Sequence, residues 1–390
     1  MRRSHRGFAG ALERAWSGEP GAWGWTRVLL PAAAAYAAAS SVARRRASRA
    51  RRGIAGLYVV AVGSLTVGGA GKSSLARWLA LEAIAGGARA AILLRGHGAG
   101  KAHGATEVVP DFDGYPFGGA LKRCGDDAVA HRAALPRSVA VAVDRDRRRA
   151  ALAVRSGYGA AVAVLDDGWE QPRLLWNELW VLLDPHCPRG NGWALPAGPL
   201  RRPTETLREA DVVAFVLEGE EEDVPESTLQ WTAARAPGAA VVRFRRALHG
   251  VSGLGGGAVE AWERDWGPAV LVSGVGAPGR LERFARSSGI EFVHHAAFPD
   301  HARWERAALE PALAGAAAQG ARIALVTEKD EARWPAGVRS TIPVRVLRAS
   351  LRPIDPTDAA LFRVRAAAAG GGGHPPDPIG SGTAGGASER

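Results

Sequence analysis

The segment Gly68-Gly69-Ala70-Gly71-Lys72-Ser73 has the residue types of a phosphate-binding loop. Glycines let successive backbone N–H groups surround phosphate oxygens, the lysine reaches the terminal phosphates, and the serine hydroxyl can bind Mg²⁺. The strict pattern begins with glycine where this chain has Thr66, and an ordinary turn containing Gly-Lys-Ser is the alternative. The residues expected to contact nucleotide are Thr66, Val67, Gly68, Gly69, Ala70, Gly71, Lys72 and Ser73.

Paired aspartates at two positions are candidates for metal binding and proton transfer. Asp166-Asp167-Gly168 follows the apolar run 162–165, and carboxylates at the end of a buried strand are where P-loop enzymes hold their metal ion. Gly125-Asp126-Asp127 precedes an expected helix, where an aspartate is also a common helix cap. The predicted Mg²⁺ site comprises Ser73, Asp166, Asp167 and Asp127. His301 is ambiguous by itself, because a lone histidine is more often structural than catalytic.

The apolar runs around these residues predict the elements that position them. Leu57–Val62 reads as a strand leading into the glycine segment, and Leu75–Ala85 as the helix leaving it. Further strand-length runs alternate with possible helices, which favours a largely parallel sheet covered on both faces. These runs are Ala90–Leu94, Val139–Val143, Ala161–Leu165, Leu179–Leu183 and, in a second series, Val270–Val272, Glu291–Val293 and Ile323–Thr327.

We therefore predict an α/β fold, with a P-loop NTPase-like, mostly parallel sheet and a second, smaller α/β domain. The expected boundaries place a membrane-association segment at 1–53, the P-loop domain at 54–218 and the second domain at 219–365. Residues 366–390 are rich in glycine, proline and alanine, and we expect this tail to be disordered.

The N-terminal region combines an apolar run with basic residues. A helix over Val28–Ala43 is shorter than the roughly 30 Å hydrocarbon core of a bilayer, so we expect it to lie in or dip into the interface. Trp16, Trp23 and Trp25 are expected at headgroup level. An ordinary alanine-rich surface helix is the alternative. The arginines expected to face anionic lipid are Arg44, Arg45, Arg46, Arg49, Arg51 and Arg52.

Composition narrows the possible partners. The formal net charge of +11 favours polyanions such as nucleotides, acidic lipids or nucleic acid. Nucleic acid is not expected, because the sequence has no zinc-ligand spacing, no RNA-binding aromatic motif and no recognition-helix pattern. Cys124 and Cys187 are too few for a disulfide framework and indicate a reducing compartment.

Taken together, the motifs resemble the tetraacyldisaccharide 4'-kinase family of lipid A biosynthesis. The resemblance runs from the N-terminal apolar segment to about Arg348, and the collinear order of the motifs makes it specific. The matching segments are 62–73, Arg95-Gly96-His97-Gly98, Gly125-Asp126-Asp127, Asp166-Asp167-Gly168, Asn191-Gly192, 195–201, 273–278, Phe298-Pro299-Asp300-His301 and Thr327-Glu328-Lys329-Asp330.

The resemblance implies an enzyme that uses ATP and Mg²⁺ to phosphorylate the 4'-hydroxyl of an acylated disaccharide 1-phosphate. It implies that Asp126 is the base toward this hydroxyl, that His301 supports Asp126 from the second domain, and that Lys72 binds the transferred phosphate. It places the site between two closing domains and the protein at an anionic membrane surface, peripheral or monotopic on the cytoplasmic face of the bacterial inner membrane. No obligate protein partner is expected.

The chain departs from the family pattern at several positions, which raises the chance of a different acceptor or reduced activity. A membrane-associated P-loop switch or chaperone without lipid phosphotransfer is the alternative function, and it would need no base at Asp126. The segment 327–330 resembles a guanine-specificity signature with its lysine one place late, so ATP is favoured over GTP. The departures are His97, Ser74, Asp127-Ala128, Glu170-Gln171 and Ala302.

Overall fold

The computed structural model describes residues 15–16, 24–68, 71–96, 105–111, 117–171, 173–219, 223–299 and 304–370. The strands are β1 (Tyr58–Ser64), β2 (Ala90–Leu94), β3 (Glu107–Val108), β4 (Val139–Val143), β5 (Val162–Leu165), β6 (Glu178–Leu183), β7 (Val212–Leu217), β8 (Ala240–Gly253), β9 (Gly256–Glu260), β10 (Ala269–Ser273), β11 (Phe292–Ala297), β12 (Ile323–Thr327) and β13 (Val344–Pro353). The helices are η1 (Gly24–Leu29), α2 (Leu30–Ala50), α3 (Lys72–Ala85), α4 (Gly118–Cys124), α5 (Asp126–Ala134), α6 (Arg147–Tyr158), η2 (Thr204–Glu209), α7 (Glu226–Ala233), η3 (Arg264–Trp266), α8 (Pro278–Ser287), α9 (Arg306–Ala318), α10 (Glu328–Arg333) and α11 (Pro356–Gly370).

All described strands join one sheet, in the order β11-β10-β12-β13-β8-β7-β6-β1-β5-β2-β4-β3, with β9 paired to β8. Neighbouring strands are parallel except at three pairings, β3 with β4, β9 with β8, and β13 with β8. The mostly parallel α/β sheet predicted from the apolar runs is therefore confirmed. Its central strands are buried on both faces, as their unbroken apolar sequences require.

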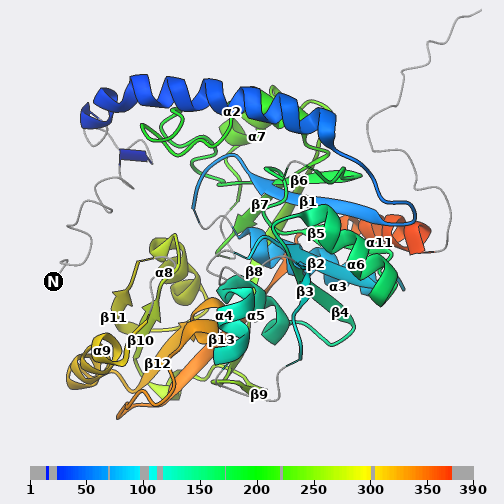
Figure 1. Cartoon of the computed structure of the whole chain (residues 1–390). Coiled ribbons are helices and arrows are strands. Elements are labelled where there is room, and N and C mark those ends of the chain that lie inside the picture. The colour runs from blue at the N-terminus through cyan, green and yellow to red at the C-terminus, as the bar shows by residue number, and fades with distance from the viewer. Residues whose placement is uncertain are drawn as a thin grey trace, which may run out of the picture.

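The long strand β8 joins two groups of strands. Its first half runs parallel to β7, and its second half runs antiparallel to β13. The strands β1 to β7 with α3, α5 and α6 form the P-loop half, and β10 to β13 with α8, α9 and α10 form the smaller C-terminal half (Figure 1). Each half has buried apolar clusters of its own. The division into two folding domains near residue 219 stays a prediction.

The last described helix returns to the P-loop half. In α11, Phe362 and Ala366 are buried in the same apolar cluster as Trp78 of α3 and Trp180 of β6. Arg365, which lies between these two residues on the helix, pairs with the buried Glu178 of β6. The packed chain therefore continues past residue 365, beyond the point where we expect it to end, and residues 371–390 lie outside the described residues.

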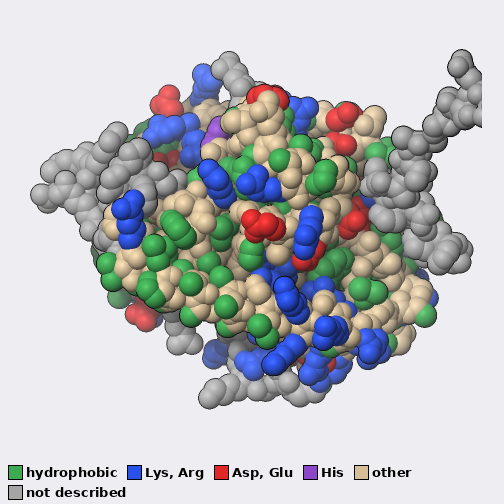
Figure 2. Space-filling view, turned by 90° about the horizontal axis from the view of Figure 1, so that it is seen from above, with side chains coloured by type: hydrophobic (Ala, Val, Ile, Leu, Met, Phe, Trp, Pro, Cys, Tyr) green, Lys and Arg blue, Asp and Glu red, His purple; other side chains and the backbone are tan. Residues whose placement is uncertain are grey.

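At the N-terminus, α2 runs across the outside of the P-loop half (Figure 1). It includes the apolar run from Leu30 onward and continues through the arginines to Ala50, with Ala33 as its buried residue. In the part of the chain that the structure describes, no helix is long and apolar enough to cross a bilayer. Seen from above, hydrophobic side chains spread over one part of this face, and Lys and Arg side chains gather in another (Figure 2).

Candidate functional site

A cavity of about 1560 Å³ opens between the two halves. It is lined by residues from the loops that follow β1 and β5, from the N-termini of α3 and α5, and from α8 and α10. Ligands of open α/β sheets bind at this position, outside the carboxyl ends of the strands. The residues predicted from sequence that line the cavity are Gly68, Gly71, Lys72, Ser73, Asp126, Asp127, Asp166 and Asp167.

The glycine loop adopts the backbone that its sequence predicts. Gly68 and Gly71 have φ of +116° and +95°, a region that favours glycine. Gly71 caps α3, so the positive end of the helix dipole faces the cavity beside Lys72. The preceding residue Val67 is fixed by its backbone N–H, which donates to the Pro199 carbonyl at 2.8 Å. Gly69 and Ala70 lie outside the described residues.

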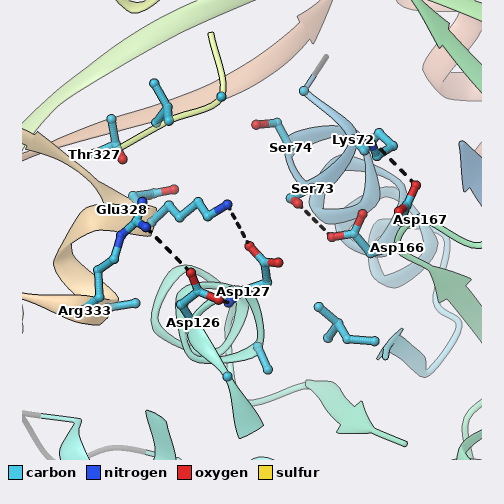
Figure 3. A pocket seen from close by; sticks show the side chains of 18 of the residues that line it. Lys72, Ser73, Ser74, Asp126, Asp127, Asp166, Asp167, Thr327, Glu328 and Arg333 are labelled. Atoms are coloured by element: carbon cyan, nitrogen blue, oxygen red, sulfur yellow. Dashed lines mark hydrogen bonds and ion pairs between the residues drawn. The ribbon is translucent and has the colours of Figure 1, made fainter. Parts of the chain in front are cut away.

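Lys72 and Ser73 face the aspartates that follow β5. The Lys72 ammonium donates to the Ser64 hydroxyl at 3.2 Å and lies 3.7 Å from Asp167 Oδ1. The Ser73 hydroxyl donates to Asp166 Oδ2 at 2.7 Å. The structure therefore brings together the loop and the Asp-Asp-Gly turn, which are far apart in sequence (Figure 3).

The Asp-Asp-Gly turn is held in an uncommon conformation. Asp167 has φ of +51°, which is uncommon for residues other than glycine, although aspartate adopts it more often than most. Arg201 donates to both carboxylate oxygens of Asp167, at 3.0 and 2.9 Å, and thereby fixes that side chain. A side chain at Gly168 would approach Leu165 Cβ to 2.3 Å, so only glycine fits there.

Both carboxylates favour the ionised form. Burial acts to raise the pKa of Asp166, but the hydrogen bonds from His131 and Ser73 and the charge of Lys72 lower that pKa to about 2. Burial opposes ionisation of Asp167 as well, and Lys72 and Arg201 lower its pKa. Two negative charges thus remain beside the loop at neutral pH.

The donor set at this position fits Mg²⁺. A serine hydroxyl and a carboxylate in contact offer hard oxygen atoms, and magnesium is usually held by one or two carboxylates together with substrate phosphates and water. Within the described ranges, no group of three or more His, Cys, Asp or Glu side chains forms a metal cage made of protein alone. Residues Ser73, Asp166 and Asp167 therefore suit a metal ion that arrives with nucleotide.

Asp126 and Asp127 occupy the opposite wall of the cavity. Gly125, with φ of +86°, turns the chain into α5, which begins at Asp126. Asp126 Oδ2 lies 3.9 Å from an Arg333 nitrogen, and Asp127 Oδ1 lies 3.4 Å from the Lys329 ammonium. Both cations come from α10 of the C-terminal half. Figure 3 shows Arg333 beside Asp126. Asp127 thus pairs with Lys329, and its predicted role as a metal ligand stays untested.

His301 lies outside the described residues. Pro299 and Trp304, the described residues nearest to His301 on either side, both lie beside Gly274, because a side chain there would come within 3.2 Å of the Pro299 carbonyl oxygen and of Trp304 Nε1. Trp304 itself lines the cavity. The predicted role of His301 stays a prediction.

Sequence reasoning missed several contacts in the site. Arg201 belongs to a matching motif, but nothing in the motif indicates that one of its nitrogens donates to both oxygens of Asp167. His131 is fully buried, and its Nε2 lies 2.9 Å from Asp166 Oδ2. It has no local signal, because its partner is distant in sequence and sits on another element.

Three of the residues that depart from the family pattern, Ser74, Glu170 and Gln171, make defined contacts in the structure. The Ser74 hydroxyl accepts a hydrogen bond from Arg246 at 3.2 Å, and Arg246 also donates to the buried Glu218. Glu170 pairs with Arg202, which stacks on Trp169. The Gln171 side chain accepts from the backbone N–H groups of Arg173 and Leu174, so it stabilises the loop that follows.

Comparison with known proteins assigns the family. The model of the family described as tetraacyldisaccharide-1-P 4'-kinase matches residues 25–364. The chain belongs to this kinase family. A relative from Anaeromyxobacter sp. (strain Fw109-5), named tetraacyldisaccharide 4'-kinase, is 35% identical over 332 residues, covering 83% of this chain and 87% of the relative. One of the same name from Geobacter sulfurreducens is 32% identical, covering 78% of this chain and 83% of its own length.

A solved structure of this kinase family shares the fold. The crystal structure of LpxK from Aquifex aeolicus in complex with ATP superposes with a TM-score of 0.65 at 22% identity, covering 88% of this chain and 99% of the other. At that identity the comparison establishes the fold. The family and the α/β fold predicted from the motifs are both confirmed.

Proposed function

We propose that this chain transfers the γ-phosphate of ATP to the 4'-hydroxyl of a tetraacyldisaccharide 1-phosphate. One observation carries the proposal. In a member of the tetraacyldisaccharide-1-P 4'-kinase family, a P-loop lysine, a Ser73–Asp166 pair and the Asp126 carboxylate all line a single cavity. A phosphate donor site and a proton acceptor therefore share one space, as transfer to an alcohol requires.

The donor side is formed by the loop and the Asp-Asp-Gly turn. Lys72 exchanges its contact with Asp167 for the β- and γ-phosphate oxygens, where its charge offsets the charge that develops during transfer. Ser73 and Asp166 would hold Mg²⁺ beside these oxygens, with Asp167 nearby. When bound, the metal ion supplies charge neutralisation on the phosphates. Arg201 keeps Asp167 neutralised while Lys72 moves.

The acceptor side is formed by the N-terminus of α5. Asp126 accepts the proton of the 4'-hydroxyl as the oxygen bonds to the γ-phosphorus, and the bond from that phosphorus to the bridging oxygen breaks with its electron pair leaving on ADP. His301 assists Asp126 from the segment between Pro299 and Trp304. The pairing of Asp126 with Arg333 and of Asp127 with Lys329 supports a cavity that is assembled by both halves.

The acylated acceptor is presented from a membrane that α2 contacts. The apolar residues Val28 of η1 and Val42 of α2 are exposed, and Arg45, Arg46 and Arg49 are exposed toward the end of α2. These features suit a helix that lies on an anionic bilayer. Just past α2, Arg51 donates at 3.5 Å to the carbonyl of Gln171, a residue that lines the cavity. The membrane-facing helix is thus connected to the rim of the site.

A phosphotransfer assay tests the function. Purified protein, labelled ATP, Mg²⁺ and the disaccharide 1-phosphate in mixed micelles should yield a bisphosphorylated lipid, and Asp126→Asn should lose that product. A P-loop switch would instead hydrolyse ATP without labelling the lipid, and it would tolerate Asp126→Asn. Absence of labelled lipid with active ATP hydrolysis would overturn the proposal.

A further inference from the structure

The buried His131 of α5 has a defined hydrogen-bonding state. Its Nδ1 accepts from Arg77 Nε at 3.3 Å, and a guanidinium can only donate, so Nδ1 carries no proton. The ring proton of the neutral imidazole therefore sits on Nε2, which donates to Asp166 Oδ2 at 2.9 Å. Arg77 therefore fixes the orientation of the His131 ring, and the ring in turn fixes the orientation of the Asp166 carboxylate.

Asp166 Oδ2 thus accepts from two donors, His131 and Ser73. The two contacts leave that carboxylate one orientation, the one that faces the start of α3. Groups that hydrogen-bond to a metal-binding side chain commonly set the affinity of a metal site in this manner. His131 has no exposed surface, so water cannot replace it as a donor.

Arg77 extends the contact to the C-terminal half. Arg77 lies one turn after Ser73 on α3. Its terminal nitrogen Nη1 pairs with Glu328, the first residue of α10. Glu328 lies 3.7 Å from Arg348 of β13, which pairs at 2.8 Å with the buried Glu331. An unbroken series of polar contacts therefore runs from the phosphate-binding loop across the cavity edge to β13.

We propose that His131 is a positioning residue for Asp166. Because Arg77 contacts both His131 and Glu328, this positioning depends on the contact of Glu328 with α3. Binding of magnesium and nucleotide is then coupled to docking of the C-terminal half, whose α10 also carries the partners of Asp126 and Asp127. The inference rests on the proposed function for the identity of the metal site.

The first experiment measures binding of a non-hydrolysable ATP analogue by calorimetry over a Mg²⁺ titration, without lipid. His131→Leu should raise the Mg²⁺ concentration needed for half-maximal nucleotide binding by about 10- to 100-fold, the usual effect of losing such a partner. His131→Gln should recover most of the affinity, because its amide can donate to Asp166. His295→Gln is the matched control, since His295 is a buried histidine with Glu282 and Ser273 as partners, and its Mg²⁺ requirement should not change.

The second experiment tests the coupling. Glu328→Gln should raise the Mg²⁺ requirement in the same direction by a smaller factor, and it should add nothing in the His131→Leu background. If His131→Leu lowers thermal stability but leaves the Mg²⁺ requirement unchanged, or if the two effects add in full, the inference is wrong. A wild-type protein that binds magnesium and nucleotide as expected but labels no lipid would refute the proposed function and leave this inference standing.

Discussion

Lys72 and Asp167 face each other across the cavity floor, with the ammonium 3.7 Å from Oδ1, and Arg201 contacts the same carboxylate through two hydrogen bonds. Asp167 therefore holds Lys72 in the site, and the position of Asp167 does not depend on Lys72, because Arg201 fixes it. When Lys72 leaves for a phosphate, or is removed, Arg201 still neutralises Asp167.

Lys72→Ala should for this reason keep the fold while losing catalysis. We expect the thermal melting temperature to stay close to that of the wild type and kcat for lipid phosphorylation to fall by at least about 100-fold, the typical effect of removing one charge-stabilising donor. Steady-state assays with labelled ATP and a melting curve on the same preparation check both parts. Turnover at the wild-type level would show that the loop lysine does not act on the transferred phosphate.

Asp126→Asn should remove the base and leave the nucleotide site intact. The amide has the shape of the carboxylate but accepts no proton at neutral pH, so kcat should fall by about 10²- to 10⁴-fold with the affinity for ATP unchanged. Asp127→Asn breaks the neighbouring pair with Lys329, and because Asp127 is also a predicted Mg²⁺ ligand, any loss that it causes should be recovered at higher Mg²⁺. A loss in Asp126→Asn that higher Mg²⁺ recovers in the same way would contradict a role of Asp126 as the base.

Replacing the exposed arginines of α2 should weaken membrane binding. Changing Arg45, Arg46 and Arg49 together to Gln should cost about 1 kcal/mol of binding energy for each arginine on anionic vesicles. Co-sedimentation with vesicles containing acidic lipid measures the loss, and vesicles of zwitterionic lipid provide the control. Nucleotide binding in solution should not change. If the variant co-sediments with these vesicles as well as the wild type does, the arginines of α2 do not contribute to binding anionic lipid.

Arg365→Met should destabilise the protein strongly, because it leaves Glu178 buried without its cation. Removing one partner of a buried ion pair typically costs about 3–5 kcal/mol of unfolding free energy. Arg363→Met is the control on the same helix, since its pair with Glu82 is half exposed and should contribute less than about 1 kcal/mol. Urea unfolding of the two variants compares them.

The loss of unfolding free energy caused by Arg365→Met should also depend on pH. Burial raises the pKa of Glu178, while Arg365 and Tyr58 pull it down, so the loss of Arg365 should raise this pKa further. A folded-state pKa above the unfolded value means that the penalty is absent below the unfolded pKa and develops as the pH rises through the folded one. The stability difference between Arg365→Met and wild type should therefore shrink in acid. A difference that grows on acidification would contradict the assignment.

Much of the phosphate-binding side could be predicted from sequence, because its signals are local. The strand, glycine loop and helix around Lys72 follow one another directly, and the Asp-Asp-Gly turn follows its own strand. The contacts of His131 could not be predicted, since they depend on β5 lying beside β1 and on how α5 packs. The pairing of Glu328 with Arg77 joins residues far apart in the chain and has no local pattern.

The return of α11 past residue 365 was missed for a related reason, because alanine-rich composition does not reveal that Phe362 and Ala366 have a surface to pack on.

The shared strand β8 limits how the two halves can move. A strand that belongs to both cannot swivel as a loose tether does, because its hydrogen bonds to β7 and β13 resist rotation on either side. Relative motion must instead be spread along the ribbon as a change of twist, with the irregular register between Arg348 and Ala349 as its softest point. Such a ribbon stores elastic energy when it is deformed, so the molecule should recoil toward one preferred arrangement after each release of product.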